Sequence, residues 1–164
     1  MTQAAAASTA QSYAPPSVTQ FSVFLDNRVG KLLELLKAFE DHPTVQVCAF
    51  SVQEASDYAV VRLVTNSSRC ARDLLVRQRL PFSETDILVV EVGRDHSLTR
   101  LCLFLLGAEL NIQFCYPVLL KPNGAPTIAL AVDDLTLAGQ ILRKKEFRLL
   151  GECDLPGPCP PMAC

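Results

Sequence analysis

The sequence predicts an α+β protein built from two similar units, and three observations lead to this fold class. The spacing of apolar residues alternates between the strand period and the helix period in the order β-α-β-β-α-β. That order occurs twice, with an offset of roughly 65 to 68 residues between equivalent elements. The chain has 164 residues, enough for two very small domains. Each unit therefore corresponds to a ferredoxin-like fold, an antiparallel sheet with both helices on one face.

The first unit begins with a strand over residues 18–25, followed by a helix. The apolar residues of this helix recur three or four positions apart, as one helical face requires. They are Val29, Leu32, Leu33, Leu36 and Phe39. The helix ends before Pro43, because the residue that precedes a proline disfavours the helical conformation. Residues 45–52 form the second strand, which is apolar on both faces.

The rest of the first unit is a hairpin strand, a helix and a long strand. Ser56 and Asp57 mark the hairpin turn, which leads into the strand that ends at residue 65. Residues 67–78 form a helix that opens with a serine cap. Its buried face is predicted to contain Cys70, Ala71, Leu74 and Leu75. Residues 82–92 close the unit as a strand.

The second unit repeats these elements. They are a strand over 86–92, a helix over 96–110, strands over 111–120 and 127–134, a helix over 135–145 and a strand over 147–155. The buried stripe of the helix over 96–110 is predicted to be Leu98, Leu101, Cys102 and Leu105. Leu103, Phe104 and Leu106 lie off that stripe, so this helix has more apolar width than one sheet requires. We therefore expect a partner helix.

The predicted domain organisation leaves no linker between the two units. It comprises a disordered leader over 1–17, a first unit over 18–87, a second unit over 88–155 and a flexible tail rich in Pro and Cys over 156–164. One strand, residues 82–92, ends the first unit and begins the second, which places the units side by side. Domains this small bury too little surface to be stable alone, so the units should pack on each other.

Composition excludes several function classes. The net charge is −2, which gives no general attraction to nucleic acid or anionic lipid. The leader lacks the basic and apolar segments of a secretory signal, and no apolar run is long enough to span a membrane, so a cytoplasmic protein is expected. The seven cysteines are an odd number, which argues against a disulfide framework. Their spacing does not match a zinc site, and no acid–base pair suggests an enzyme.

RNA binding is the alternative that a ferredoxin-like sheet raises. Cations do cluster at the ends of the second helix of each unit, for example Arg77 and Arg143, but they also suit the helix dipole there. RNA-binding versions of this fold need exposed aromatic residues on their central strands. Residues 59–64 and 127–132 contain none, so nucleic acid is not expected as a partner.

The turn between the first strand and the first helix is the best candidate site. The backbone N–H groups at a helix N-terminus can accept a carboxylate, and a glycine lets a ligand approach the backbone closely. Gly30 supplies that glycine, and Asp26 could bind an ammonium group. The alternative is that Asp26 or Asn27 simply caps the helix while Arg28 is solvated.

The element order together with the turn Asp26-Asn27-Arg28-Val29-Gly30 resembles the ACT domain, a small regulatory module that binds amino acids. The stretches ILVVEV, LNIQFCY and TIALAVDD resemble the second half of stand-alone tandem ACT proteins, some of them related to acetolactate synthase regulatory subunits. The resemblance covers about residues 18 to 155. It implies two ACT-like domains.

The resemblance also implies a ligand site between two modules, formed by the first turn of one and the second strand of the other. The implied ligand-binding residues are Asp26, Asn27, Arg28, Val29, Gly30, Cys115, Tyr116 and Pro117. A reciprocal second site would contain Asp95, His96, Ser97, Leu98, Ala49 and Phe50. Its turn has no glycine after Gly93, so this second site departs from the family pattern.

The function that this resemblance implies is regulatory and non-catalytic, through binding of a small amino acid at the interface between the two domains. The alternative is a module that has lost its ligand and only assembles with a biosynthetic enzyme. The implied partners are a small amino acid, an enzyme subunit and a second copy of the chain. Neither nucleic acid nor membrane is expected, and no cofactor or metal is implied.

Overall fold

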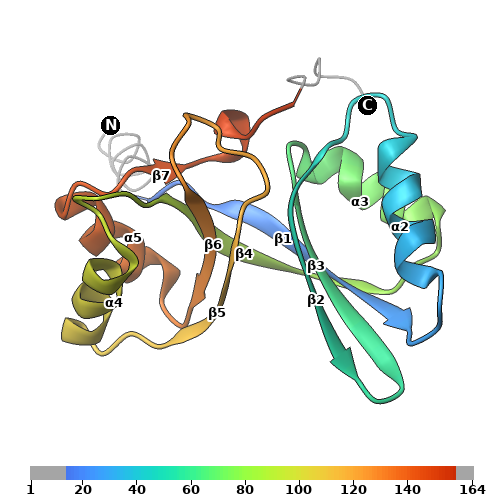
Figure 1. Ribbon diagram of the computed structural model, residues 1–164, viewed down its shortest axis with the longest axis horizontal. Helices are drawn as coiled ribbons and strands as arrows, with labels where there is room; N and C mark the ends of the chain where they lie inside the picture. Colours follow the sequence, from blue (N-terminus) through green and yellow to red (C-terminus); the bar gives the residue numbers. More distant parts are fainter. Residues whose placement is uncertain (1–13, 158–164) are drawn as a thin grey trace, which may run out of the picture.

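The computed structural model describes residues 14–157 and contains two βαββαβ units in one chain (Figure 1). The strands are β1 (Val18–Asp26), β2 (Val47–Ala55), β3 (Tyr58–Thr65), β4 (Phe82–Glu91), β5 (Ile112–Pro117), β6 (Thr127–Val132) and β7 (Leu149–Leu150). The helices are α2 (Lys31–Glu40), α3 (Ser68–Arg77), α4 (Leu98–Gly107) and α5 (Leu135–Lys144), followed by a short 3-10 helix, η1 (Glu152–Asp154). The element order that the sequence predicts is confirmed.

Strand β4 is shared by the two units. The strands lie in the order β2-β3-β1-β4-β6-β5, with β7 also paired to β4. The half of β4 up to Ile87 pairs with β1, and the half from Leu88 pairs with β6 and β7, all antiparallel. We propose that the boundary between the two domains lies at this change of partner.

The open faces of the two halves of the sheet pack against each other. In Figure 1, α2 and α3 flank one side of the molecule and α4 and α5 flank the other, with the strands between them. The core between the two halves contains Cys48 and Val64 from the first unit and Ala129 and Ala131 from the second, all almost fully buried. This packing explains why the second strand of each unit is apolar on both faces.

Each unit also has a core between its sheet and its own helices. Phe21 and Leu75 are fully buried in the first of these cores, and Leu105 and Leu142 are fully buried in the second. Ser67 caps α3, as the sequence predicts, by accepting a hydrogen bond from the Cys70 N–H.

Two details of the second unit differ from the prediction. Leu98 and Cys102 are exposed, because the face of α4 that packs on the sheet is centred on Leu101 and Leu105. The last strand has only the two residues of β7, since the chain then turns into η1. There the Glu152 carboxylate accepts a hydrogen bond from the Ser68 N–H of the first unit at 2.6 Å.

Both ends of the described chain contact the folded body. Pro15 is buried, and its ring lies against Gly139 of α5. At the other end, the Pro156 carbonyl accepts a hydrogen bond from the Cys48 thiol at 3.5 Å. Residues 1–13 of the predicted leader and 158–164 of the predicted tail lie outside the described residues.

The ion pair between Arg72 and Glu84 should make stability depend weakly on pH. The guanidinium donates two hydrogen bonds to the carboxylate, at 2.6 and 2.7 Å, and this contact lowers the pKa of Glu84. The stabilisation is therefore present above the carboxyl pKa of the unfolded chain and is lost as the pH falls through the lowered pKa of the folded protein.

Because both side chains are partly exposed, we expect Glu84→Gln to cost at most about 1 kcal/mol at pH 7. Urea unfolding at pH 7 and pH 3 would measure the difference, which should be smaller at pH 3. The pair Lys31–Glu34 is a more exposed control, and Glu34→Gln should change stability less. A cost for Glu84→Gln that is equal at both pH values would contradict this explanation.

Candidate functional site

The turn between β1 and α2 leaves the N-terminus of α2 without a side-chain cap. Gly30 is the N-cap residue and has φ 92°, a left-handed conformation that favours glycine. No side chain of the described residues hydrogen-bonds to this helix end. The helices α3, α4 and α5, in contrast, are capped by Ser67, Ser97 and Asp134. The alternative in which Asp26 or Asn27 caps the helix is therefore wrong.

Asn27 instead ties the turn to the β2–β3 hairpin. Its side-chain amide donates to the Glu54 carboxylate at 2.9 Å and to the Ser56 carbonyl at 3.3 Å. Asp26 lies opposite Tyr58 in the β1–β3 ladder, whereas Glu54 lies opposite Ala59, in the row of Leu25, so the two residues occupy opposite faces of the sheet at the end beside the turn. Sequence reasoning missed Glu54, because its position depends on how the hairpin pairs with β1.

The sequence predicts three residues of β5 in the same site as this turn, but they lie elsewhere on the sheet. They are Cys115, Tyr116 and Pro117. Tyr116 is buried, and its hydroxyl donates to the Gln20 side-chain oxygen at 2.7 Å. Burial raises the pKa of Tyr116, an effect that the charge of Arg62 partly offsets. Gln20 precedes Asp26 by six residues of extended β1, a separation of about 20 Å. Within one chain the structure therefore does not bring Tyr116, or its exposed neighbours Cys115 and Pro117, to the turn.

The turn between β4 and α4, which is assigned to the second site, differs in local structure from the turn before α2. Ser97 caps α4 by accepting a hydrogen bond from the Arg100 N–H, and the backbone carbonyl of Asp95 accepts one from the Arg100 side chain. His96 packs edge-on against Phe147, with ring centroids 4.9 Å apart, and Leu98 is exposed.

The two β2 residues assigned to the second site also differ from each other. Ala49 is fully buried in the core between the sheets, whereas Phe50 lines a pocket. Since Ala49 faces the core between the halves of the sheet and Phe50 packs against the core under the helices, they lie on opposite faces of β2 and do not share one ligand-accessible surface.

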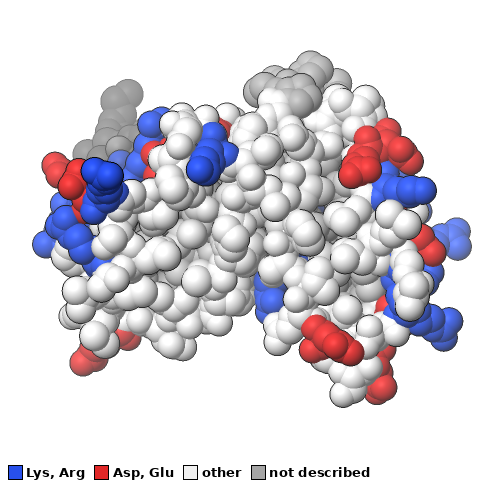
Figure 2. All heavy atoms as spheres, in the orientation of Figure 1, with Lys and Arg blue, Asp and Glu red and all other residues white. Residues whose placement is uncertain are grey.

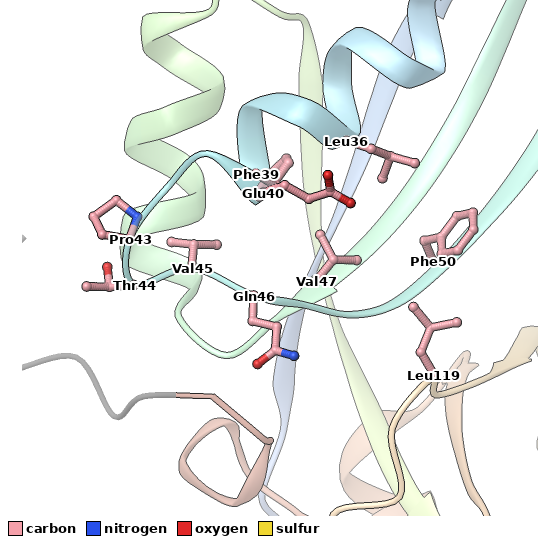
Figure 3. A pocket seen from close by; sticks show the side chains of 10 residues that line it. All are labelled: Leu36, Phe39, Glu40, Pro43, Thr44, Val45, Gln46, Val47, Phe50 and Leu119. Carbon is pink, nitrogen blue, oxygen red and sulfur yellow. The ribbon is translucent and has the colours of Figure 1, made fainter.

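The largest of the cavities described lies between α2 and the beginning of β2, and we call it the α2–β2 pocket (Figure 3). Its volume is about 500 Å³. It is lined by Leu36, Phe39, Glu40, Pro43, Thr44, Val45, Gln46, Val47, Phe50 and Leu119. All come from the first unit except Leu119, which follows β5 in the second. Of these residues the sequence predicted only Phe50 as part of a site.

Charge is unevenly distributed over the molecule. On the face in Figure 2, charged side chains gather over the outer flanks, and the middle of the molecule is mostly uncharged. This face therefore presents no continuous basic surface of the kind that nucleic-acid backbones require.

The described part of the chain contains neither a metal-binding cluster nor a membrane-spanning helix. Residues 14–157 contain no group of His, Cys, Asp and Glu side chains that could hold a metal ion. Among the same residues, no helix is long and apolar enough to cross a membrane.

The described cysteines should differ sharply in reactivity. Cys102, Cys115 and Cys153 are exposed free thiols, and Cys48 is a buried one. Cys70 is disulfide-bonded, a pairing that the odd cysteine count did not predict. Burial, with a smaller effect of the Glu152 charge, raises the pKa of Cys48 to about 12. Because the thiolate is the reactive form, Cys48 should be protected from alkylation.

We expect iodoacetamide at pH 8 to modify Cys48 at least about a hundredfold more slowly than the exposed thiols. Peptide mapping by mass spectrometry would measure each rate. Cys48 should reach the rate of the others once the protein is unfolded in guanidinium. Rapid modification of Cys48 in the native protein would show that the core between the sheets opens readily.

The fold and the turn together define a class of protein: tandem ferredoxin-like units joined through a shared strand, with an open helix N-terminus after the first strand. The chain belongs to the ACT domain pair family, which matches residues 16–155. The resemblance to ACT domains and the predicted fold class are thereby confirmed. A pair of ACT domains has a regulatory, ligand-binding role.

Two solved structures have the same fold. A protein of Bacteroides thetaiotaomicron superposes with a TM-score of 0.76 at 19% identity, covering 85% of this chain and 96% of that one. The ligand-free regulatory subunit of aspartate kinase from Thermus thermophilus has a TM-score of 0.53 at 9% identity, covering 81% and 95% of the two chains. No curated protein sequence matches the chain.

Proposed function

We propose that this protein is a non-catalytic regulator that binds a small amino acid at the turn Asp26–Gly30. The ligand carboxylate would accept hydrogen bonds from the free N–H groups at the start of α2. The ligand ammonium would pair with the carboxylate of Asp26 or Glu54. The observation that carries this proposal is the N-terminus of α2, which has no side-chain cap, after a turn that holds Glu54 through Asn27, since a zwitterion needs both a donor group and a carboxylate.

The ACT domain pair family supports the proposal, because the family role is regulatory and ligand-binding. The exposure of the turn supports it too: the residues from Asp26 to Gly30 are all open to solvent. Of the β5 residues, the exposed Cys115 and Pro117 would complete the interface site only in a homodimer that brings β5 of one copy to the turn of the other, whereas Tyr116 is buried and would not reach a ligand. Sedimentation velocity with and without the amino acid would test that extension.

Amino-acid binding should raise the melting temperature by mass action. At a ligand concentration of 100 times Kd the stabilisation is about 2.7 kcal/mol, which shifts Tm by roughly 5 to 10 °C for a chain of this size. A thermal-shift titration across the twenty amino acids measures it. Melting curves that stay flat for the unaltered protein would remove the ligand from the proposal.

Substitutions at the turn should weaken the response selectively. Asp26→Asn removes a partner of the ammonium and should raise Kd about fivefold or more. Asp57→Asn is the matched control, because Asp57 is an exposed carboxylate on the adjacent hairpin and its contact with the turn is through its backbone carbonyl. Equal responses of the two variants would place the ligand elsewhere.

A second candidate function, assembly with a biosynthetic enzyme without a ligand, is favoured by α4. Leu98, Leu103 and Leu106 on this helix are 50%, 58% and 70% exposed, so an apolar face has no partner within the described residues. Co-purification of an enzyme subunit, combined with no thermal response to any amino acid, would select this function. Loss of the partner in Leu106→Glu would locate the interface on α4.

A further inference from the structure

The α2–β2 pocket is distinct from the turn in which we place the amino acid. The turn lies at the N-terminus of α2, whereas the pocket is lined by Leu36, Phe39 and Glu40 near its C-terminus. From Gly30 to Glu40 the helix advances about 15 Å, so one small molecule could not fill both places. The chemistry of the pocket must therefore be considered by itself.

The walls of the pocket are mainly apolar. Leu36 and Phe39 of α2 form one side, and Val47 and Phe50 of β2 form the other. Figure 3 shows these side chains around a common space, with Leu119 reaching toward Phe50 from the second unit. A volume of about 500 Å³ with apolar walls is typical of sites for small organic molecules.

A single charge faces this space. Among the ten described residues that line the pocket, only Glu40 carries a charge. Glu40 is exposed, and Figure 3 shows its carboxylate on the side of α2 that faces Val47. None of the ion pairs of the described residues involves Glu40. An unpaired carboxylate beside apolar walls favours a ligand with a positive charge at one end and an apolar body.

We propose that the α2–β2 pocket binds a small molecule with an apolar body and a cationic amine, the amine pairing with Glu40. The apolar body lies between α2 and β2 and reaches Leu119. A carboxylate on the ligand is disfavoured, because no lysine or arginine lines the pocket. This inference does not depend on the proposed amino-acid site.

Such a ligand would bridge the two units. The Leu119 N–H donates to the Cys48 carbonyl of β2 at 2.8 Å, and the Leu119 side chain is 55% exposed at the edge of the pocket. A bound molecule that covers this side chain adds an apolar contact between the units. Binding should therefore stabilise the arrangement of the second unit on the first.

Three probes that differ only at the polar end test the proposal on the full chain. They are 2-phenylethylamine, 2-phenylethanol and phenylacetate, whose end groups are positive, neutral and negative at pH 7. We expect NMR titration to give the amine a Kd two- to fivefold lower than the alcohol, and phenylacetate the weakest binding. The backbone amide shifts should be largest at Leu36, Val47 and Leu119. Equal Kd values for the three probes, or shifts that map elsewhere, would overturn the proposal.

Two variants distinguish pairing with Glu40 from a general electrostatic attraction of the amine to the protein. Glu40→Gln should bring the Kd of the amine to that of the alcohol and leave the alcohol unchanged. Asp41→Asn removes the same charge one residue further along, outside the pocket lining, and should preserve the preference for the amine. If both variants abolish that preference, general electrostatic attraction explains it and the proposed pairing is wrong. Asp26→Asn should not affect the amine, which keeps this result distinct from failure of the amino-acid site.

Discussion

Ala129→Asp should destabilise both units of the protein together, by at least about 3 kcal/mol at pH 7. Ala129 belongs to the core between the two halves of the sheet, opposite Val89 on β4 and Tyr116 on β5, and is fully buried. A carboxylate at this position would lie among apolar side chains, and burying an unpaired charge is among the most destabilising substitutions.

The cost should depend on pH with a definite sign. Burial would raise the pKa of the new carboxyl above its value in the unfolded chain, so the folded state binds the proton more tightly. Stability should therefore fall as the pH rises from about 4, and the variant should recover part of its stability at low pH. Urea unfolding between pH 3 and pH 7 would measure this trend.

Ser83→Asp is the matched control, because Ser83 is an exposed residue on β4 and its substitution should change stability by less than about 0.5 kcal/mol. Hydrogen exchange would report on the two units separately. Because β4 belongs to both sheets, amides of α3 and α5 should exchange faster to the same degree in Ala129→Asp. Faster exchange in the second unit alone would mean that the two units unfold independently.

Tyr116→Phe should lower the free energy of unfolding by about 1 to 3 kcal/mol, although it removes only one oxygen atom. The lost hydroxyl is the donor to the Gln20 side-chain oxygen, and Gln20 is fully buried. The substitution leaves that oxygen without a partner in a place that water does not reach, so its desolvation is no longer compensated.

A double-mutant cycle would identify this mechanism. Gln20→Leu in the Tyr116→Phe background removes both polar groups, so the double variant should be more stable than Tyr116→Phe alone. Tyr58→Phe is the control on an exposed tyrosine and should have little effect. If the double variant were less stable than Tyr116→Phe by the full cost of Gln20→Leu, the two residues would be contributing independently.

The spacing of apolar residues was sufficient to predict the order of helices and strands, because each helix and most strands bury one face. The serine before α3, for example, predicted its cap correctly. The last strand was overestimated because residues after Leu150 leave the sheet to contact α3, where Glu152 accepts a hydrogen bond from Ser68. Those two residues are 84 positions apart, and no local pattern of apolar residues encodes such a contact.

The candidate site was only partly predictable for a related reason. Gly30 and the residues before it mark a turn in the sequence itself. That α2 has no side-chain cap, and that Glu54 is beside Asn27, depends on the conformation of the turn and on the pairing of the hairpin with β1. The position of the exposed Glu40 carboxylate over Val47 depends on how α2 packs over β2, which the helical spacing of its apolar residues does not specify.

The shared strand β4 limits how the length of this protein can vary. Its even-numbered residues, such as Phe82 and Leu88, face the helices of both units, and Ile87 and Val89 face the core between the sheets. One inserted residue would turn one unit inside out with respect to the other, because side chains alternate along a strand. Two inserted residues would restore the faces but slide the units apart by about 7 Å, enough to separate Tyr116 from Gln20. Insertions and deletions in relatives of this chain should therefore fall in the turns and spare residues 82–91.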